Sequence, residues 1–386
     1  MNSALSGLQT RLAEEAAWAK AWLFDAALPM WSTIGIDAAG FIEKIDLTGN
    51  PIEAPRRSLV QCRQIYSYCE AKKLGWVGPW HGAIQTGLNA LERDCETADG
   101  TLVYATGSGG DARIDLYTQA FGLFAYANAY GVLGKPAALK AKAERLLAWM
   151  QAHLGHEMGG FDETRPRSLP LRSNPHMHTF EALQAWMAVD AEGPWQATAE
   201  IVAKLCLTKF IDPATGALRE YFAGDWSAMP DDTGKIAEPG HQYEWAWLLS
   251  RWSTATGDAA ALAAGRRMLE FGLATGIDAK RGVPVHETWL NGSLKDPMAR
   301  LWPNTERLKA ALAFAALATS DDERAGCLSH ALDACVALRS YLNVPIHGLW
   351  RDKLNADSTW VDEPAPASSF YHVICGYAEL IAASKA

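Results

Sequence analysis

The sequence has little that would tie it to a nucleotide, a membrane or a nucleic acid. GxGxxG, P-loop and GxSxG patterns are missing, and no helical HxxxH or HExxH pair occurs. No run of about 18 apolar residues exists, so no membrane span is expected. The formal net charge of −9 argues against the clustered basic surface that nucleic-acid binding needs. These absences disfavour dinucleotide-binding, phosphate-loop, serine-hydrolase and nucleic-acid-binding functions.

Cysteine is also sparse. The seven cysteines form an odd set without a CxxC pair, which is typical of buried, reduced thiols rather than of a disulfide framework. The first 22 residues mix Arg11, Glu14, Glu15 and Lys20 with alanine and leucine, and they lack the basic start and apolar block of a signal peptide. We therefore expect a cytoplasmic protein that is a monomer or a homodimer.

The chain does contain a long-period repeat. A glycine followed by strand-like residues recurs at intervals of 60, 60, 56, 66 and 66 residues, at Gly40, Gly100, Gly160, Gly216, Gly282 and Gly348. A second turn signal follows each of them. No linker rich in Pro, Gly or Ser interrupts this repeat, so we expect one domain over residues 1–386.

Alanine- and leucine-rich stretches with helical spacing separate the glycines. They predict helices at 60–73, 115–130, 136–154, 178–190, 194–210, 242–256, 258–275, 305–319, 321–341 and 371–384. Strands are expected only in short hairpins next to the glycines. A period above fifty residues suits a closed ring of helix pairs. The expected fold class is all-α, with six helix pairs arranged as an inner and an outer ring.

Four predicted helix starts carry histidines or carboxylates, at 173–181, 238–245, 302–306 and 368–372. Each has an ordinary structural explanation as a helix cap, a first-turn carboxylate or core packing. Their recurrence at matching places in successive repeats favours a site where these helix starts meet. His176 and His178 do not form a metal motif, because no third ligand adjoins them. The 16 tryptophans suit sugar faces but suit helix packing equally well.

The run Pro-Gly-His-Gln-Tyr-Glu-Trp-Ala-Trp-Leu-Leu at 239–249 closely resembles a signature of the N-acylglucosamine 2-epimerase family. The motifs at 62–66, 174–178, 301–306 and 371–372 resemble the family in the same order, so the similarity spans essentially the whole chain. The resemblance implies an (α/α)6 barrel that interconverts sugars at C2 without a metal or another cofactor. Family members include 2-epimerases of acylated hexosamines, cellobiose and glucose, and aldose–ketose isomerases of mannose and lyxose.

The resemblance also implies roles for individual residues. His241 and His372 would form the acid/base pair that moves the proton at C1 and C2, and His178 would act in ring opening. Arg63 would stabilise the enediolate, and Glu244 would orient His241. Substrate binding would fall to Asn174, Tyr117, Met177, Trp302 and Glu306. Ser368 stands where some isomerases of the family have glutamine, which leaves the contacts to the distal end of the sugar undefined.

Histidine suits this chemistry because it takes and returns protons near neutral pH. Returning the proton to C1 of a cis-enediol produces a ketose, whereas returning it to C2 from the opposite face produces an epimer. Short loops around Trp302 and Arg56–Arg57 favour a monosaccharide, so we expect a D-mannose to D-fructose isomerase. The alternatives are a 2-epimerase, a glycoside hydrolase using Glu244 and Glu306, and a non-catalytic binding protein. Arg56 and Arg57 would hold a sugar phosphate or form a solvated surface.

Overall fold

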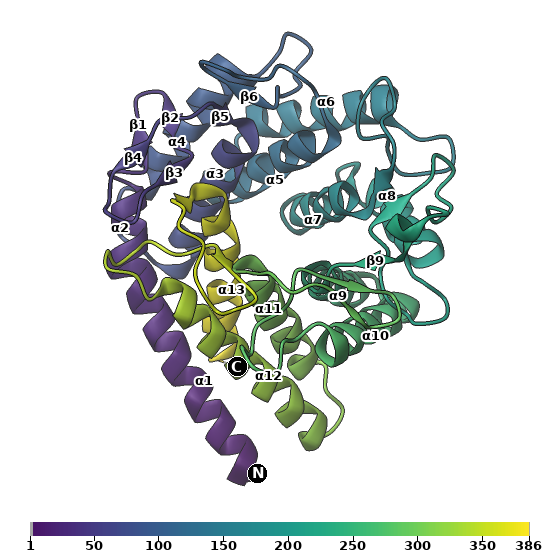
Figure 1. Cartoon of the computed structure of the whole chain (residues 1–386). Coiled ribbons are helices and arrows are strands. Elements are labelled where there is room, and N and C mark those ends of the chain that lie inside the picture. The colour runs from purple at the N-terminus through teal and green to yellow at the C-terminus, as the bar shows by residue number, and fades with distance from the viewer. Residues whose placement is uncertain (1–2, 386) are drawn as a thin grey trace.

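The computed structural model describes residues 3–385, and its helices form two concentric rings (Figure 1). The inner ring consists of α3 (Ser58–Leu74), α5 (Leu116–Val132), α7 (Ser173–Val189), α9 (Pro239–Thr256), α11 (Trp302–Ala316) and α13 (Ala367–Ala383). Each inner helix packs on the next, and α13 packs on α3, which closes the ring. The expected (α/α)6 barrel is confirmed.

The outer ring consists of α1 (Ser3–Trp22), α4 (Trp80–Ala90), α6 (Ala137–Leu154), α8 (Trp195–Leu205), α10 (Ala259–Thr275) and α12 (Asp321–Leu342). In α6 the buried residues Leu139, Ala143, Leu146 and Met150 recur at three- and four-residue spacing, which is the pattern of a helix with one buried face. The N-terminal helix α1 packs on α12 and α13 (Figure 1). The first helix of the chain is therefore the outer partner of the last inner helix.

Three outer helices end in a single π-helical turn, namely η1 (Leu23–Ala27), η2 (Leu91–Cys95) and η3 (Cys206–Phe210). The short helix α2 (Leu28–Trp31) follows η1. Neither α1 nor α4 was among the helices predicted from the sequence. None of the helices within residues 3–385 combines the length and the apolar character needed to cross a membrane.

The repeated glycines lie in the long connections that lead from an outer helix to the next inner helix. All six have positive φ angles, between +70° at Gly282 and +119° at Gly40. Glycine adopts this left-handed region without the steric penalty that a Cβ atom brings. The connections from inner to outer helices are short, so the long connections gather where the inner helices begin.

Short strands join these long connections into a belt. Hairpins form within a connection at β1 (Ile36–Asp37) with β2 (Gly40–Phe41), β3 (Lys44–Ile45) with β4 (Pro51–Ile52), and β10 (Glu287–Trp289) with β11 (Leu294–Asp296). The other pairs link neighbouring connections: β5 (Arg56–Arg57) with β6 (Ala105–Thr106), β7 (Leu171–Arg172) with β8 (Tyr221–Phe222), β9 (Ile236–Ala237) with β10, β12 (Ala299–Arg300) with β13 (Lys353–Leu354), and β14 (Ala365–Pro366) with β3. The sequence predicted hairpins alone, and it missed this pairing between connections.

Five inner helices begin earlier than the sequence predicted, α3 by two residues and four others by three to five. The helices α7, α9, α11 and α13 start at Ser173, Pro239, Trp302 and Ala367. The predicted ranges start after Pro175, Pro239 and Pro303, but proline is tolerated in the first helical turn, where its missing N–H has no partner to lose. The earlier starts bring the polar residues of these segments into the first two turns.

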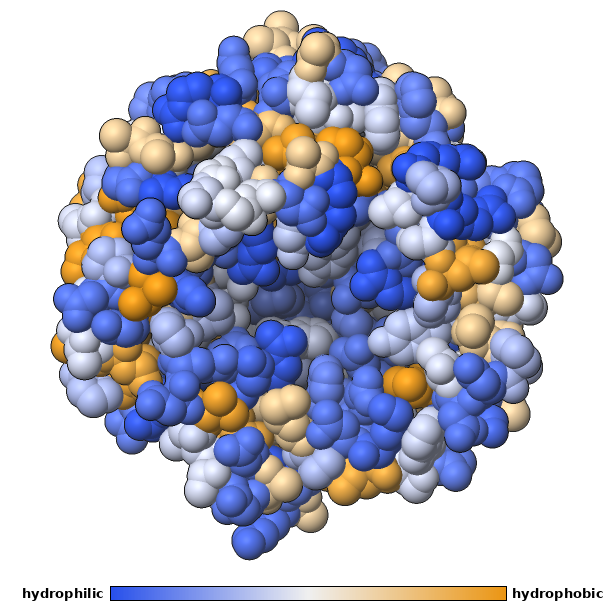
Figure 2. Space-filling view, turned by 45° about the horizontal axis from the view of Figure 1, so that its top comes forward, coloured by the Kyte–Doolittle hydropathy of each residue, from blue (hydrophilic) through white to orange (hydrophobic). Residues whose placement is uncertain are grey.

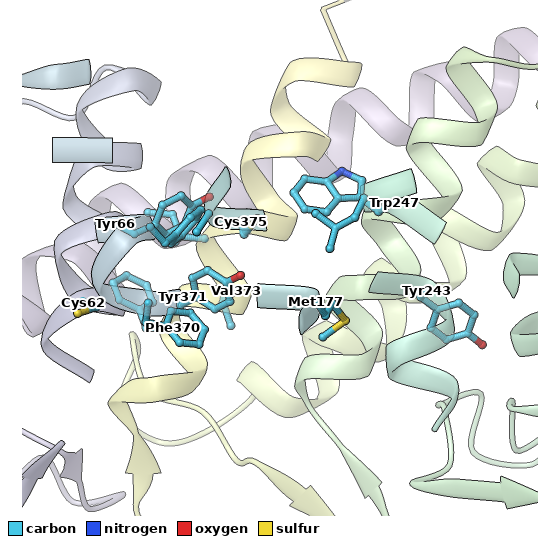
Figure 3. Packing of buried hydrophobic residues seen from close by; sticks show 14 of the residues in the cluster. Cys62, Tyr66, Met177, Tyr243, Trp247, Phe370, Tyr371, Val373 and Cys375 are labelled. Carbon is cyan, nitrogen blue, oxygen red and sulfur yellow. The ribbon is translucent and has the colours of Figure 1, made fainter. Parts of the chain in front are cut away.

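Large apolar side chains of the inner helices form a buried cluster (Figure 3). Tyr243, Phe370 and Tyr371 are among the buried residues that this view labels. All seven cysteines are unpaired, and only Cys327 is more than marginally exposed. The thiols therefore behave as small core side chains, as expected.

Two glycines of the repeat allow backbone strain to be separated from crowding. A Cβ added at Gly348 (φ +98°) would lie 2.8 Å from the backbone oxygen of Ala26. At Gly282 (φ +70°), no non-neighbouring heavy atom of residues 3–385 lies within 4 Å of that position. We expect Gly282→Ala to cost about 1 kcal/mol of unfolding free energy and Gly348→Ala about 3 kcal/mol or more. Urea unfolding of both variants tests this, and equal losses would contradict it.

Candidate active site

A polar cavity of about 300 Å³ lies where the six inner helices begin. Figure 2 shows a central hollow with largely hydrophilic walls. The cavity is lined by residues from every inner helix and from the connections, including Arg57, Arg63, Tyr117, Asn174, His178, Glu238, His241, Glu244, His286, Arg300, Trp302, Ser368, Ser369 and His372. The structure thus brings together eight of the ten predicted site residues at the cavity wall.

The spacing within each helix explains this convergence. Residues four apart lie on the same face of a helix, so two successive turns can face one cavity. Asn174 and His178 of α7 have this spacing, and both line the cavity. Ser368 and His372 of α13 repeat the arrangement. His176 points elsewhere, where its Nε2 accepts the Phe161 N–H at 3.0 Å.

His241 is held by carboxylates. Its Nδ1 donates to Glu220 Oε2 at 2.9 Å and lies 3.6 Å from Glu238 Oε2. Burial disfavours the charged imidazolium, but the carboxylates of Glu220 and Glu238 outweigh burial and raise the pKa of His241 to about 10. His241 is therefore a proton donor at neutral pH, and its Nε2 lies 3.1 Å from the side-chain amide of Asn174, whose oxygen can accept from it when the amide is turned.

His372 has the opposite character. Its Nδ1 donates to Glu306 Oε1 at 2.9 Å, and the other oxygen of Glu306 pairs with the buried Lys309 Nζ at 2.6 Å. Burial and the positive charges of Arg63 and Lys309 hold the pKa of His372 well below 6.5. With Nδ1 committed to Glu306, the unprotonated Nε2 is available as a base.

Trp302 packs near both of these histidines. Its ring centroid is 5.2 Å from that of His241 and 5.5 Å from that of His372. Both imidazoles therefore adjoin one indole at the wall of the same cavity. Groups whose surroundings separate their pKa values in this way are suited to acid and base roles on one substrate.

His178 forms a third histidine–carboxylate pair. Its Nδ1 donates to Glu181 Oε2 at 3.1 Å, and Tyr371 Oη donates to Glu181 Oε1 at 2.5 Å. Burial lowers the pKa of His178 to about 4, so this imidazole is neutral. It can hold a hydroxyl group of a substrate or accept a proton from one.

Arg63 supplies a fixed positive charge to the cavity. Its guanidinium donates to the Ser368 carbonyl and to Tyr117 Oη, both at 3.0 Å. It also stacks on Phe121, with Cζ 4.4 Å from the ring centroid. Within residues 3–385 no carboxylate forms an ion pair with Arg63, so its charge is available to a developing oxyanion.

Three predicted residues lie differently from the expectation. Glu244 does not hold His241; its Oε1 is 3.9 Å from His178 Nδ1. Neither oxygen of Glu244 has a hydrogen-bond donor among the described residues, and burial together with nearby Glu306 raises its pKa well above 4.5. Glu306 is fully buried and holds His372 rather than reaching the cavity. Met177 is fully buried in the apolar cluster of Figure 3 and does not line the cavity.

Sequence reasoning missed Glu220, Glu238 and Arg300 at the site, and Asp352 next to it. The repeat contains a signal for two of them, since Glu220 follows Gly216 by four residues and Asp352 follows Gly348 by four. The backbone explains why this position matters: the Ser173 N–H donates to the Glu220 carbonyl and the Leu301 N–H to the Asp352 carbonyl. These bonds join one connection to the start of an inner helix.

The same position in the repeat therefore supplies an acid next to a basic side chain at the cavity. Glu220 holds His241, and Asp352 Oδ2 accepts from Arg300 at 3.1 Å. In the first repeat the acid lies one residue earlier, three residues after Gly40, and Glu43 Oε2 accepts from Arg57 Nε at 2.8 Å. Arg56 does not line the cavity; it pairs with Asp37.

Among residues 3–385, three groups of histidine and carboxylate side chains each have their ligand atoms within 4.8 Å of one another, namely His178–Glu181–Glu244, Glu220–Glu238–His241 and Glu244–Glu306–His372. In each group the histidine Nδ1 already faces a carboxylate. In the third group Glu306 also forms an ion pair with Lys309. We assign none of them as a metal site.

An (α/α)6 barrel with carboxylate-held histidines and an unpaired arginine around one small polar cavity defines a class of enzymes that move protons on a small polar substrate. The family model described as N-acylglucosamine 2-epimerase (GlcNAc 2-epimerase) matches residues 40–376. The chain belongs to this family, and it is an enzyme of the isomerase class that isomerises or epimerises a sugar.

Individual relatives agree with this assignment. A mannose-6-phosphate isomerase from Rhizobium meliloti (strain 1021) is 45% identical over 369 residues, which cover 93% of this chain and 95% of that protein. The solved structure of a D-mannose isomerase has a TM-score of 0.83 at 18% identity, covering 98% of this chain and 97% of its own. The cellobiose 2-epimerase of Bacillus thermoamylovorans B4167 also has a TM-score of 0.83 at 18% identity, covering 95% and 98%. At this identity, the two structures establish the shared fold.

Proposed function

We propose that the protein interconverts D-mannose and D-fructose through a cis-enediol, without a cofactor. One observation carries the proposal: a neutral His372 and a protonated His241 face one cavity of hexose size, and both adjoin Trp302. The cavity volume of about 300 Å³ leaves little room for more than a monosaccharide.

The chemistry follows from the Nε2 atom of each imidazole, since Nδ1 is held by a carboxylate in both. His372 Nε2 takes the proton from C2 of the open-chain aldose and returns it to C1. His241 donates a hydrogen bond from Nε2 to a sugar oxygen, and the Arg63 guanidinium stabilises the negative charge of the enediolate. The neutral His178 is placed to accept a hydroxyl proton during ring opening. A general-base step of this kind supplies about 10²–10⁴ in rate.

Two earlier alternatives fit the geometry less well. A glycoside hydrolase needs two carboxyl groups on either side of the scissile bond. Glu306 is fully buried and engaged by His372 and Lys309, so it does not flank a substrate. A purely non-catalytic role leaves the opposite protonation of the two histidines without a use.

A phosphorylated substrate is the second candidate. The relative from Rhizobium meliloti is named for mannose 6-phosphate, and Arg57 and Arg300 line the cavity. Both arginines are already paired, with Glu43 and Asp352, which leaves less positive charge for a phosphate dianion. We therefore place the free sugar first.

The test is an NMR assay of mannose and mannose 6-phosphate in D₂O, with and without EDTA. We expect fructose from mannose at a rate that EDTA leaves unchanged. Faster turnover of the phosphorylated sugar would favour the second candidate, and glucose as the main product would identify a 2-epimerase. Binding of either sugar without turnover would overturn the proposal.

A further inference from the structure

The carboxylate of Glu220 is more fully engaged than any role in substrate binding requires. It is 3% exposed, and its Oε2 accepts from both His241 Nδ1 at 2.9 Å and Ser173 Oγ at 3.0 Å. Its Oε1 accepts from the backbone N–H of Glu238 at 3.2 Å. Three donors from α7, α9 and the residue before α9 thus fix one carboxylate directly behind the histidine.

The charges next to His241 and next to His372 therefore differ. Within residues 3–385, no lysine or arginine forms an ion pair with Glu220 or Glu238, the two carboxyls at His241 Nδ1. The single carboxylate behind His372 is shared with Lys309. Other titratable or charged groups around His241 come from α7, α9 and the connection before α11, and they are His178, Glu244, His286 and Arg300.

The second carboxyl does not replace the first. Burial raises the pKa of Glu238 to about 7, so it is partly protonated at neutral pH. Glu238 also lines the cavity, where a substrate hydroxyl would compete for it. Glu220 is the carboxylate that stays behind the imidazole.

We propose that Glu220 is a positioning residue that keeps His241 protonated and thereby directs the reaction toward isomerisation rather than epimerisation. The inference rests on the proposed function. In isomerisation the C2–H bond breaks, His372 takes the proton, and the same proton forms the C1–H bond, while the hydroxyl proton of O2 is transferred to O1. Both histidines then end as they began. In epimerisation His372 keeps the C2 proton while His241 gives its own proton to C2 from the opposite face.

Epimerisation therefore leaves the enzyme with a neutral His241 beside Glu220 and a charged His372 beside Arg63. This product state is disfavoured because His241 has a higher pKa than His372, so the proton is more stable on His241. The carboxylate of Glu220 maintains this difference in pKa. Removing the charge of Glu220 reduces the difference in pKa between His241 and His372 and keeps the shape of the site. A pKa change of about one to two units corresponds to about a ten- to hundredfold change in the ratio of the two protonated states.

The experiment compares Glu220→Gln with the wild-type protein. The amide oxygen of glutamine can still accept from His241 Nδ1, but the charge is gone. We expect the ratio of glucose to fructose formed from mannose to rise about ten- to hundredfold, and the basic limb of the kcat–pH profile to move toward neutrality. Ser173→Ala is the matched control, because it removes one hydrogen bond and keeps the carboxylate; its product ratio should equal that of the wild type.

Reduced kcat with an unchanged product ratio and an unchanged basic limb would overturn the proposal, since a merely structural role predicts that result. If Glu220→Gln does not fold, NMR titration of His241 in the wild-type protein decides instead. A midpoint well above 8 supports the proposal, and one near the ordinary histidine value of about 6.5 overturns it. Failure of wild-type protein to turn over either sugar would sink the proposed function, whereas the His241 titration would still be measurable.

Discussion

Replacement of His372 by asparagine is expected to lower kcat by about 10²–10⁴-fold, because the variant loses its general base. Asparagine can keep the hydrogen bond to Glu306, which the imidazole Nδ1 makes at 2.9 Å. It has no nitrogen lone pair to receive the C2 proton. Because substrate contacts with Arg63, His178 and Trp302 are retained, the change in KM should be small beside the change in kcat.

The measurement is steady-state kinetics on the sugar identified by the NMR assay, with circular dichroism to show that the variant is folded. The exposed His347, outside the cavity, provides the control, and His347→Asn should have wild-type kinetics. A His372→Asn variant with more than about a tenth of wild-type kcat would exclude His372 as the base.

Replacement of Lys309 by methionine is expected to cost about 3–5 kcal/mol of unfolding free energy. Lys309 and Glu306 are both fully buried, and their ion pair spans 2.6 Å. Burial disfavours the charge on Lys309, but the Cys375 thiol and the carboxyl groups of Glu306 and Glu244 outweigh burial and raise its pKa. Methionine occupies similar space and leaves the Glu306 carboxylate buried without its cation.

Urea unfolding measures the loss, and a double-mutant cycle identifies its cause. In the variant that also carries Glu306→Gln, a neutral amide replaces the carboxylate, so much of the lost unfolding free energy should return. Losses that simply add in the double variant would show that the two residues do not stabilise each other. Glu306→Gln also acts on His372, so stability rather than activity is the informative readout here.

The repeat was the most informative part of the sequence, and its physical basis explains why. Each repeated glycine has a positive φ angle, which other residues adopt only with strain. Because this backbone conformation favours glycine, the positions that require it can be recognised from the sequence alone. The helices between the glycines were predictable for a similar reason, since their spacing of apolar residues reflects burial of one face.

Helix starts and the belt of strands were less predictable. The first turn of a helix tolerates proline, so Pro239 and Pro303 lie inside their helices although the predicted ranges start after them. Strands such as β7 and β8 are two residues long and pair between connections, so they carry no periodic pattern. Their pairing depends on the closure of the ring.

The sequence by itself determined the ring of helix pairs, the family, and the identity of the histidines and the arginine at the helix starts, because local backbone geometry and side-chain chemistry require particular residue types at particular spacings. Only the tertiary structure decided which carboxylate holds which histidine. Glu220 is 21 residues from His241, and Glu306 is 66 residues from His372. The protonation of each imidazole follows from burial and from charges a few ångströms away, and these distances come into existence only when the ring closes.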